Sequence, residues 1–123
     1  MKLLTHNMMR SHCKGVVNGF PLKLSSTQVD VKEIEFNADF VNRMLSRLEW
    51  SALVEIANQL GVGDGLPEML PEEHKFDDED VLKKIHHVLL EVEVIEGELE
   101  CPETGRKFPI SRGIPDMRLN EDE

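Results

Sequence analysis

The sequence lacks a long apolar segment and has few cysteines. No apolar stretch approaches the roughly 20 residues that a helix needs to cross a bilayer. The first residues, MKLLTHNMMRSH, also lack the apolar core of a signal peptide. The only cysteines, Cys13 and Cys101, lie far apart, which does not suggest a disulfide-rich secreted scaffold. We therefore expect a reduced, intracellular protein with no membrane segment.

Basic residues are scarce as well. The 123 residues include 14 Lys and Arg against 24 Asp and Glu, which gives a formal net charge of -10. This balance disfavours a freestanding nucleic-acid binder, because such proteins gain affinity from cations that displace counterions from phosphates. An acidic protein can still act in a complex whose partner supplies the basic surface.

The hydrophobic periodicity predicts an α+β fold. Alternating apolar residues, typical of strands, occur in residues 22–36 and again after residue 92, near both ends of the chain. Helical spacing fills the middle, where Asn37 is well placed to cap the first helix. We expect a small antiparallel sheet domain made of residues 1–36 plus 92–123, with residues 37–91 inserted as a helical lobe.

A zinc site is the first chemical candidate, because Cys101 opens the turn-like stretch CPETG. A closed structural site needs about four Cys or His ligands. Cys13, His12 or His6 could join Cys101 if the two chain ends meet in space. However, the sequence has no C-x-x-C motif, and Thr104 is a poor ligand. The alternative is a free, partly buried thiol.

A second candidate is the pair His86 and His87 on the last predicted helix. His87 and Glu91 are four residues apart and share a helix face, so a small metal-dependent hydrolase using these three residues together with Cys101 is one hypothesis. The alternative is structural, because a histidine near a helix C-terminus is favoured there as a cation.

The segment KFPISRGIPDMRL is the third candidate. Pro109 and Pro115 lack the amide hydrogens of a strand ladder, which suits an edge strand. Such an edge either pairs with another chain or is covered within its own chain, and the pattern leaves both open. The apolar residues of this segment are Phe108, Ile110, Ile114, Met117 and Leu119.

Several stretches together resemble one family. MKLLTHNMM, GFPL, EWSAL and HHVLLEVEVIEGELECPETGRKFPISRGIPDM occur in this order. They resemble the eukaryotic multifunctional methyltransferase subunit, the tRNA methyltransferase 112-like family, over nearly the whole chain except residues 61–75. The resemblance implies a zinc-ribbon-like sheet domain with a central helical lobe. It also implies a non-catalytic subunit that activates and stabilises several S-adenosylmethionine-dependent methyltransferases, which modify tRNA, ribosomal RNA and a translation release factor.

The resemblance implies heterodimers with class I methyltransferase catalytic subunits, formed by strand addition and apolar contacts. The partner would bind S-adenosylmethionine and the RNA, in cytoplasm and nucleus, and this chain would need no cofactor or membrane. Arg112 and Gly113 would shape the turn that presents the contact residues. We expect those contact residues to be Asn7, Phe108, Ile110, Ile114, Pro115, Met117 and Leu119.

The resemblance also bears on zinc. The four zinc cysteines of some family members correspond here to Ser11, Val16, Cys101 and Thr104, so only one ligand remains. Cys13 lies between the two N-terminal positions. We expect a form without zinc, whose stability depends more strongly on its partner because the metal-linked part of the folding free energy is missing.

Overall fold

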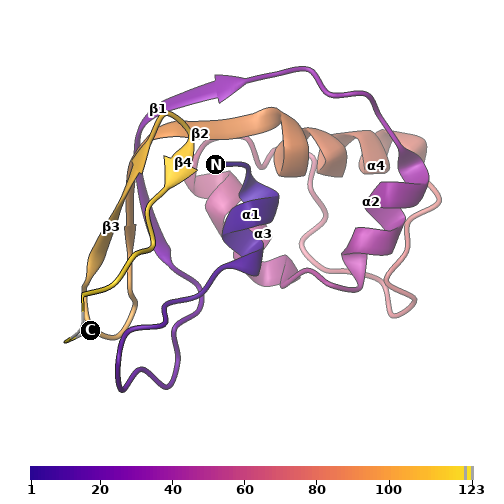
Figure 1. The fold of residues 1–123 in the computed structure, drawn as a ribbon. Helices are drawn as coiled ribbons and strands as arrows, with labels where there is room; N and C mark the ends of the chain where they lie inside the picture. Colours follow the sequence, from indigo (N-terminus) through magenta and orange to yellow (C-terminus); the bar gives the residue numbers. More distant parts are fainter. Residues whose placement is uncertain (121, 123) are drawn as a thin grey trace.

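The computed structural model describes residues 1–120 and 122 and has the α+β architecture shown in Figure 1. The sheet lies on one side of the molecule in this view and the helices on the other, with the N-terminus beside β4. In chain order the elements are α1 (Leu3–Met8), β1 (Lys23–Val31), α2 (Ala38–Leu45), α3 (Trp50–Gln59), α4 (Glu79–His86), a π-helical turn η1 (His87–Glu91), β2 (Val92–Glu100), β3 (Lys107–Ser111) and β4 (Ile114–Pro115).

The sheet joins segments from both ends of the chain. Its strand order is β1-β2-β3-β4, and each neighbouring pair is antiparallel. The pairing of β1 with β2 skips Thr27 on one strand and Ile95 on the other. These irregularities reset the in-and-out alternation, so Val94 and Leu99 are both fully buried although they are five positions apart, an odd offset.

The helix α2 begins where the sequence predicts. The Asn37 side chain accepts a hydrogen bond from the Phe40 amide at 3.0 Å and so caps α2. Asp78 caps α4 in the same way, through the amide of Asp80. Trp50 opens α3, and its indole N–H donates to the carbonyl of Pro67 at 3.0 Å, which ties the following loop to the helix.

One hydrophobic core serves both the sheet and the helices. Its buried members include Leu3 of α1, Leu24 of β1, Leu53 of α3, Ile85 of α4 and Phe108 of β3. The α+β fold class and the antiparallel strands are confirmed, whereas the division into a sheet domain and an inserted lobe stays a prediction. Within the part of the chain that the structure describes, no helix has the length and apolar character to span a membrane.

Candidate functional site

The hairpin that leads into β4 is held rigidly. Its two-residue turn consists of Arg112 and Gly113, both with positive φ (53° and 77°), as tight β-hairpins require. The Gly113 amide donates to the carbonyl of Ile95 at 2.9 Å, and the Arg112 amide donates to the carboxylate of Glu96 at 3.2 Å. On its other side, the amino group of Met1 donates to the Gly113 carbonyl at 2.7 Å. The turn therefore places β4 in a fixed position.

The strand that this turn presents is an open edge. β4 is the last strand in the sheet order, so no strand among the described residues pairs with its outer side. Ile114 exposes 69% of its surface, and Pro115 beside it is half-buried. An exposed apolar edge is suited to pair with a strand of another chain.

An apolar groove lies next to this edge. It has a volume of about 280 Å³, and the buried ring of Phe108 belongs to its lining. Met8, at the end of α1, exposes 48% of its surface. The lining residues come from the N-terminal and C-terminal segments and are Met8, Met9, Arg10, His12, Phe108, Met117 and Leu119.

Three of the predicted contact residues are already covered within the chain. Phe108 and Ile110 are 1% and 2% exposed and belong to the core. Asn7 is 5% exposed, and its side-chain amide donates to the carbonyl of Glu49 and accepts from the amide of Glu49, both at 3.0 Å. Asn7 thus anchors α1 to the start of α3, and contact of these three side chains with a partner stays a prediction.

The N-terminal part of the groove was missed in the sequence. The pair Met8 and Met9 was visible as apolar residues ahead of a polar loop, but nothing local indicates what they face. Their position beside Met117 and Leu119 arises from a long-range contact between the chain ends. The groove therefore adds Met8, Met9, Arg10 and His12 to the predicted site.

Three of the four residues that the resemblance aligns with zinc cysteines, Ser11, Cys101 and Thr104, come together. The Thr104 amide donates to the Cys101 sulfur at 3.5 Å, and the buried Ser11 hydroxyl donates to the same sulfur. Burial raises the pKa of the Cys101 thiol, but the hydrogen bonds from Ser11, Thr104 and the backbone of Glu103 outweigh it and lower the pKa to about 7. A hydrogen-bonded sulfur thus lies between Ser11 and the CPETG turn, residues 101–105.

This arrangement does not fit zinc. Of the four corresponding positions only Cys101 offers a thiolate, because Ser11 and Thr104 carry hydroxyls and Val16 has no donor. Over residues 1–120 and 122, no group of three or more His, Cys, Asp or Glu could hold a metal ion. Cys13, also buried, has its amide bonded to Ser11 at 3.4 Å. That the protein functions without zinc remains a prediction.

The histidine pair and Glu91 form hydrogen bonds within the chain. His87 Nδ1 donates to Glu91 at 2.8 Å, and the other oxygen of Glu91 accepts from the Ile34 amide at 2.9 Å. His86 Nε2 donates to the Ile34 carbonyl at 2.9 Å. The bond from Ile34 is the main reason that the pKa of Glu91 is lowered, with burial opposing it and His87 and His86 adding to it. These contacts fix the segment after β1 and give no support to the hydrolase alternative.

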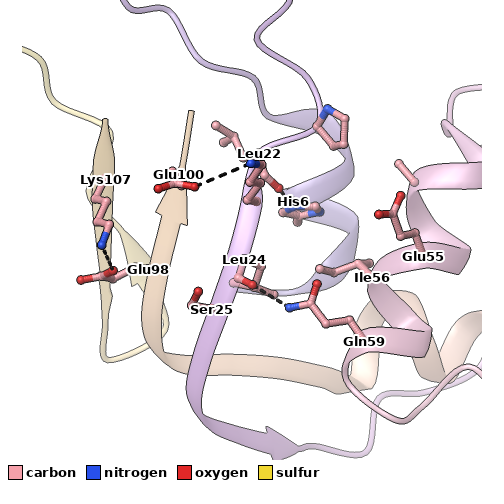
Figure 2. Close-up of a pocket in the computed structure, with 13 residues that line it drawn as sticks. His6, Leu22, Leu24, Ser25, Glu55, Ile56, Gln59, Glu98, Glu100 and Lys107 are labelled. Atoms are coloured by element: carbon pink, nitrogen blue, oxygen red, sulfur yellow. Dashed lines mark hydrogen bonds and ion pairs between the residues drawn. The ribbon is translucent and has the colours of Figure 1, made fainter. Parts of the chain in front are cut away.

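The start of β1, the opposite edge of the sheet, is capped by side chains, whereas the strand from Thr27 onward is exposed. Gln59 of α3 donates to the Leu24 carbonyl at 2.6 Å, as Figure 2 shows. His6 Nε2 donates to the Leu22 carbonyl at 2.7 Å; burial lowers the pKa of His6, with this hydrogen bond opposing it, so the ring is neutral at pH 7. A groove of about 450 Å³ follows this edge. Its far rim carries cross-strand ion pairs, including Lys107 with Glu98.

The chain matches proteins of known family along its whole length. The family model of the Trm112p-like proteins matches residues 2–113. A Mus musculus protein named multifunctional methyltransferase subunit TRM112-like protein is 54% identical over 124 residues, covering 100% of this chain and 98% of its own. The Saccharomyces cerevisiae multifunctional methyltransferase subunit TRM112 is 31% identical, covering 97% and 96%.

A solved structure shares the fold. It is a chain from the E. cuniculi Mtq2-Trm112 complex, which is described as responsible for methylation of the eRF1 translation termination factor. The superposition has a TM-score of 0.60 at 20% identity and covers 95% of this chain and 94% of that one. With the family model and the close relatives, it leads to one conclusion: the chain belongs to the Trm112p-like protein family.

Proposed function

We propose that this protein is a non-catalytic subunit that binds, stabilises and activates several S-adenosylmethionine-dependent methyltransferases. The observation that carries the proposal is the open apolar edge at β4, flanked by an apolar groove, on a protein with a net charge of -10. The names of its relatives, multifunctional methyltransferase subunits, support the same assignment.

The mechanism is differential binding. A strand of the methyltransferase pairs with β4 through main-chain hydrogen bonds, while Ile114 and the groove cover apolar surface of the enzyme. Because the subunit binds the folded, cofactor-competent form of the enzyme, it increases the population of that form. The enzyme binds S-adenosylmethionine and carries the reacting groups, and this chain contributes none.

The substrates follow from the partners. We infer that they are tRNA, ribosomal RNA and a translation release factor, and that this chain reaches RNA only through its enzymes, in cytoplasm and nucleus. The E. cuniculi complex, described as acting on eRF1, supports the release-factor branch. The acidic composition supports indirect contact with RNA, because free phosphate binding needs a cationic surface.

The test is co-expression with an Mtq2-like methyltransferase, followed by size-exclusion chromatography and measurement of S-adenosylmethionine binding. We expect a one-to-one heterodimer, and an enzyme that binds the cofactor only when the subunit is present. Separate elution of the two chains, with cofactor binding by the enzyme alone, would contradict the proposal. Metal analysis of the purified complex tests the expected lack of zinc in this chain.

A further inference from the structure

The groove beside β4 is lined mainly by flexible side chains. Met8, Met9 and Met117 are three of its seven lining residues. Methionine has three rotatable bonds and a polarizable sulfur, so a surface rich in it can repack around apolar groups of different shapes. Proteins that accept several partners use such surfaces.

The groove is continuous with the open edge. Met117 and Leu119 lie only two and four residues after Pro115, the last residue of β4. Phe108 belongs to β3, the strand that pairs with β4. A strand that pairs with β4 therefore runs next to the groove, and a side chain from that strand or its flanking segment can enter it.

The groove also has a defined charge. Arg10 and His12 are exposed members of its lining, and none of the described lining residues is acidic. A basic side chain at this rim favours a partner segment with a carboxylate there.

We propose that the groove receives an apolar side chain of the methyltransferase, flanked in the enzyme by an acidic residue that faces Arg10. The methionines let the same groove fit different apolar side chains. Pairing with β4 is then the part of the interface that all partners share, and the groove sets their relative affinities. The inference rests on the proposed function and names the determinant of partner choice within it.

The experiment is a competition inside cells. One tagged methyltransferase is co-expressed with equal amounts of wild-type and variant subunit, and intact-mass spectrometry of the captured complex gives the ratio of the two. It is done with two enzymes, an Mtq2-like methyltransferase and an RNA methyltransferase. Competition suits this system because neither enzyme has to be stable alone.

Met8→Glu places a charge at the groove without removing a core residue, since Met8 is about half exposed in the free chain. We expect capture by both enzymes to fall at least about tenfold, with the thermal midpoint of the free subunit unchanged. Met117→Glu is the second variant and should behave alike. Wild-type capture of both variants would overturn the groove as part of the interface.

The adaptability is tested with Met8→Leu and Met117→Leu, which keep the groove apolar but stiffen it. We expect the capture ratio to change by different factors for the two enzymes, about threefold apart or more. Equal factors would overturn the role of the groove in partner choice. Arg10→Glu should lower capture more than Arg10→Gln does. Equal capture of the two variants would overturn the proposal that an acidic residue of the enzyme faces Arg10.

Ile114→Asp in the same competition separates this inference from the proposed function. If Ile114→Asp is excluded from the complex while the groove variants are captured normally, the groove inference alone is wrong. If Ile114→Asp is captured as well as wild type, the β4 edge and the proposed mode of binding are wrong together.

Discussion

The two edges of the sheet are built in opposite ways. At the start of β1, side chains of α1 and α3 bond two backbone carbonyls, His6 that of Leu22 just before the strand and Gln59 that of Leu24. Along β4, a rigid turn presents Ile114 to solvent at 69% exposure. The difference is that the chain caps the start of β1 with its own side chains and leaves Ile114 of β4 exposed.

The comparison indicates which edge is available to a partner. β1 has nine residues, and an edge strand of that length is a template for uncontrolled pairing unless it is protected. β4 has two residues, one of them a proline without an amide hydrogen, so it offers few main-chain bonds by itself. A short open edge therefore binds selectively only when a neighbouring surface adds contacts, and the methionine groove is such a surface.

The largest effect is expected when the same negative charge is placed on each edge of the sheet. Ile114→Asp should weaken methyltransferase binding by about 100-fold or more, because the interface would bury an unpaired carboxylate. The matched control is Val31→Asp on β1, where Val31 is 61% exposed. We expect this control to retain binding, and both variants to keep the thermal midpoint of the wild type.

Competition capture and thermal unfolding measure both effects. Equal loss of binding in the two variants would show that the enzyme does not distinguish the edges. Loss of binding by Val31→Asp alone would assign the interface to β1.

The next largest effect concerns the CPETG turn, residues 101–105, which precedes β3. The folded pKa of Cys101 is about 7, below the ordinary 9.0, so the fold favours the thiolate. The stabilisation is complete above about pH 9, declines as the pH falls from 9 to 7, and is absent below 7, with an upper limit of roughly 2–3 kcal/mol. Urea unfolding at several pH values should show this slope in wild type and a flatter one in Cys101→Ala.

Cys13→Ser is the control for that measurement, because Cys13 is also buried but is bonded to Ser11 only through its amide. Its pH slope should match that of wild type. If the unfolding free energy of Cys101→Ala depends on pH as strongly as that of wild type, the thiolate does not stabilise the CPETG turn.

Asn7→Ala tests the helix that serves both edges, because Asn7 anchors α1, which carries His6 and Met8. The variant loses both hydrogen bonds to Glu49 and should destabilise the free subunit by about 1–3 kcal/mol in chemical unfolding. Methyltransferase binding should fall less than in Ile114→Asp, because the edge itself is intact. An unchanged unfolding free energy would show that the two hydrogen bonds between Asn7 and Glu49 do not stabilise the subunit.

The smallest effect is expected from removing the side-chain cap at the start of β1. Gln59→Ala frees the Leu24 carbonyl and should cost about 0.5–1.5 kcal/mol, the net contribution of one hydrogen bond. Analytical ultracentrifugation should also show more self-association than in wild type, while methyltransferase binding stays the same. A monomeric variant at high concentration would mean that Gln59 is not what keeps this edge from pairing.

The candidate site was predictable only in part. The apolar edge was visible in KFPISRGIPDMRL, because two prolines among alternating apolar residues indicate an edge strand. The same pattern could not separate the exposed Ile114 from the buried Phe108 and Ile110, since apolar residues look alike whether they face a core or a partner. The N-terminal half of the groove carried no local signal.

Several structural features follow from local signals in the sequence. The cap at Asn37, the helical spacing that follows and the turn residues Arg112 and Gly113 are local, because each depends on neighbours within a few residues. Which strand end the chain caps and which residues form the groove depend on long-range contacts in the folded chain. The capping of β1 by His6 and Gln59 and the meeting of Met8 with Met117 join residues far apart in the chain, and no local pattern encodes such contacts.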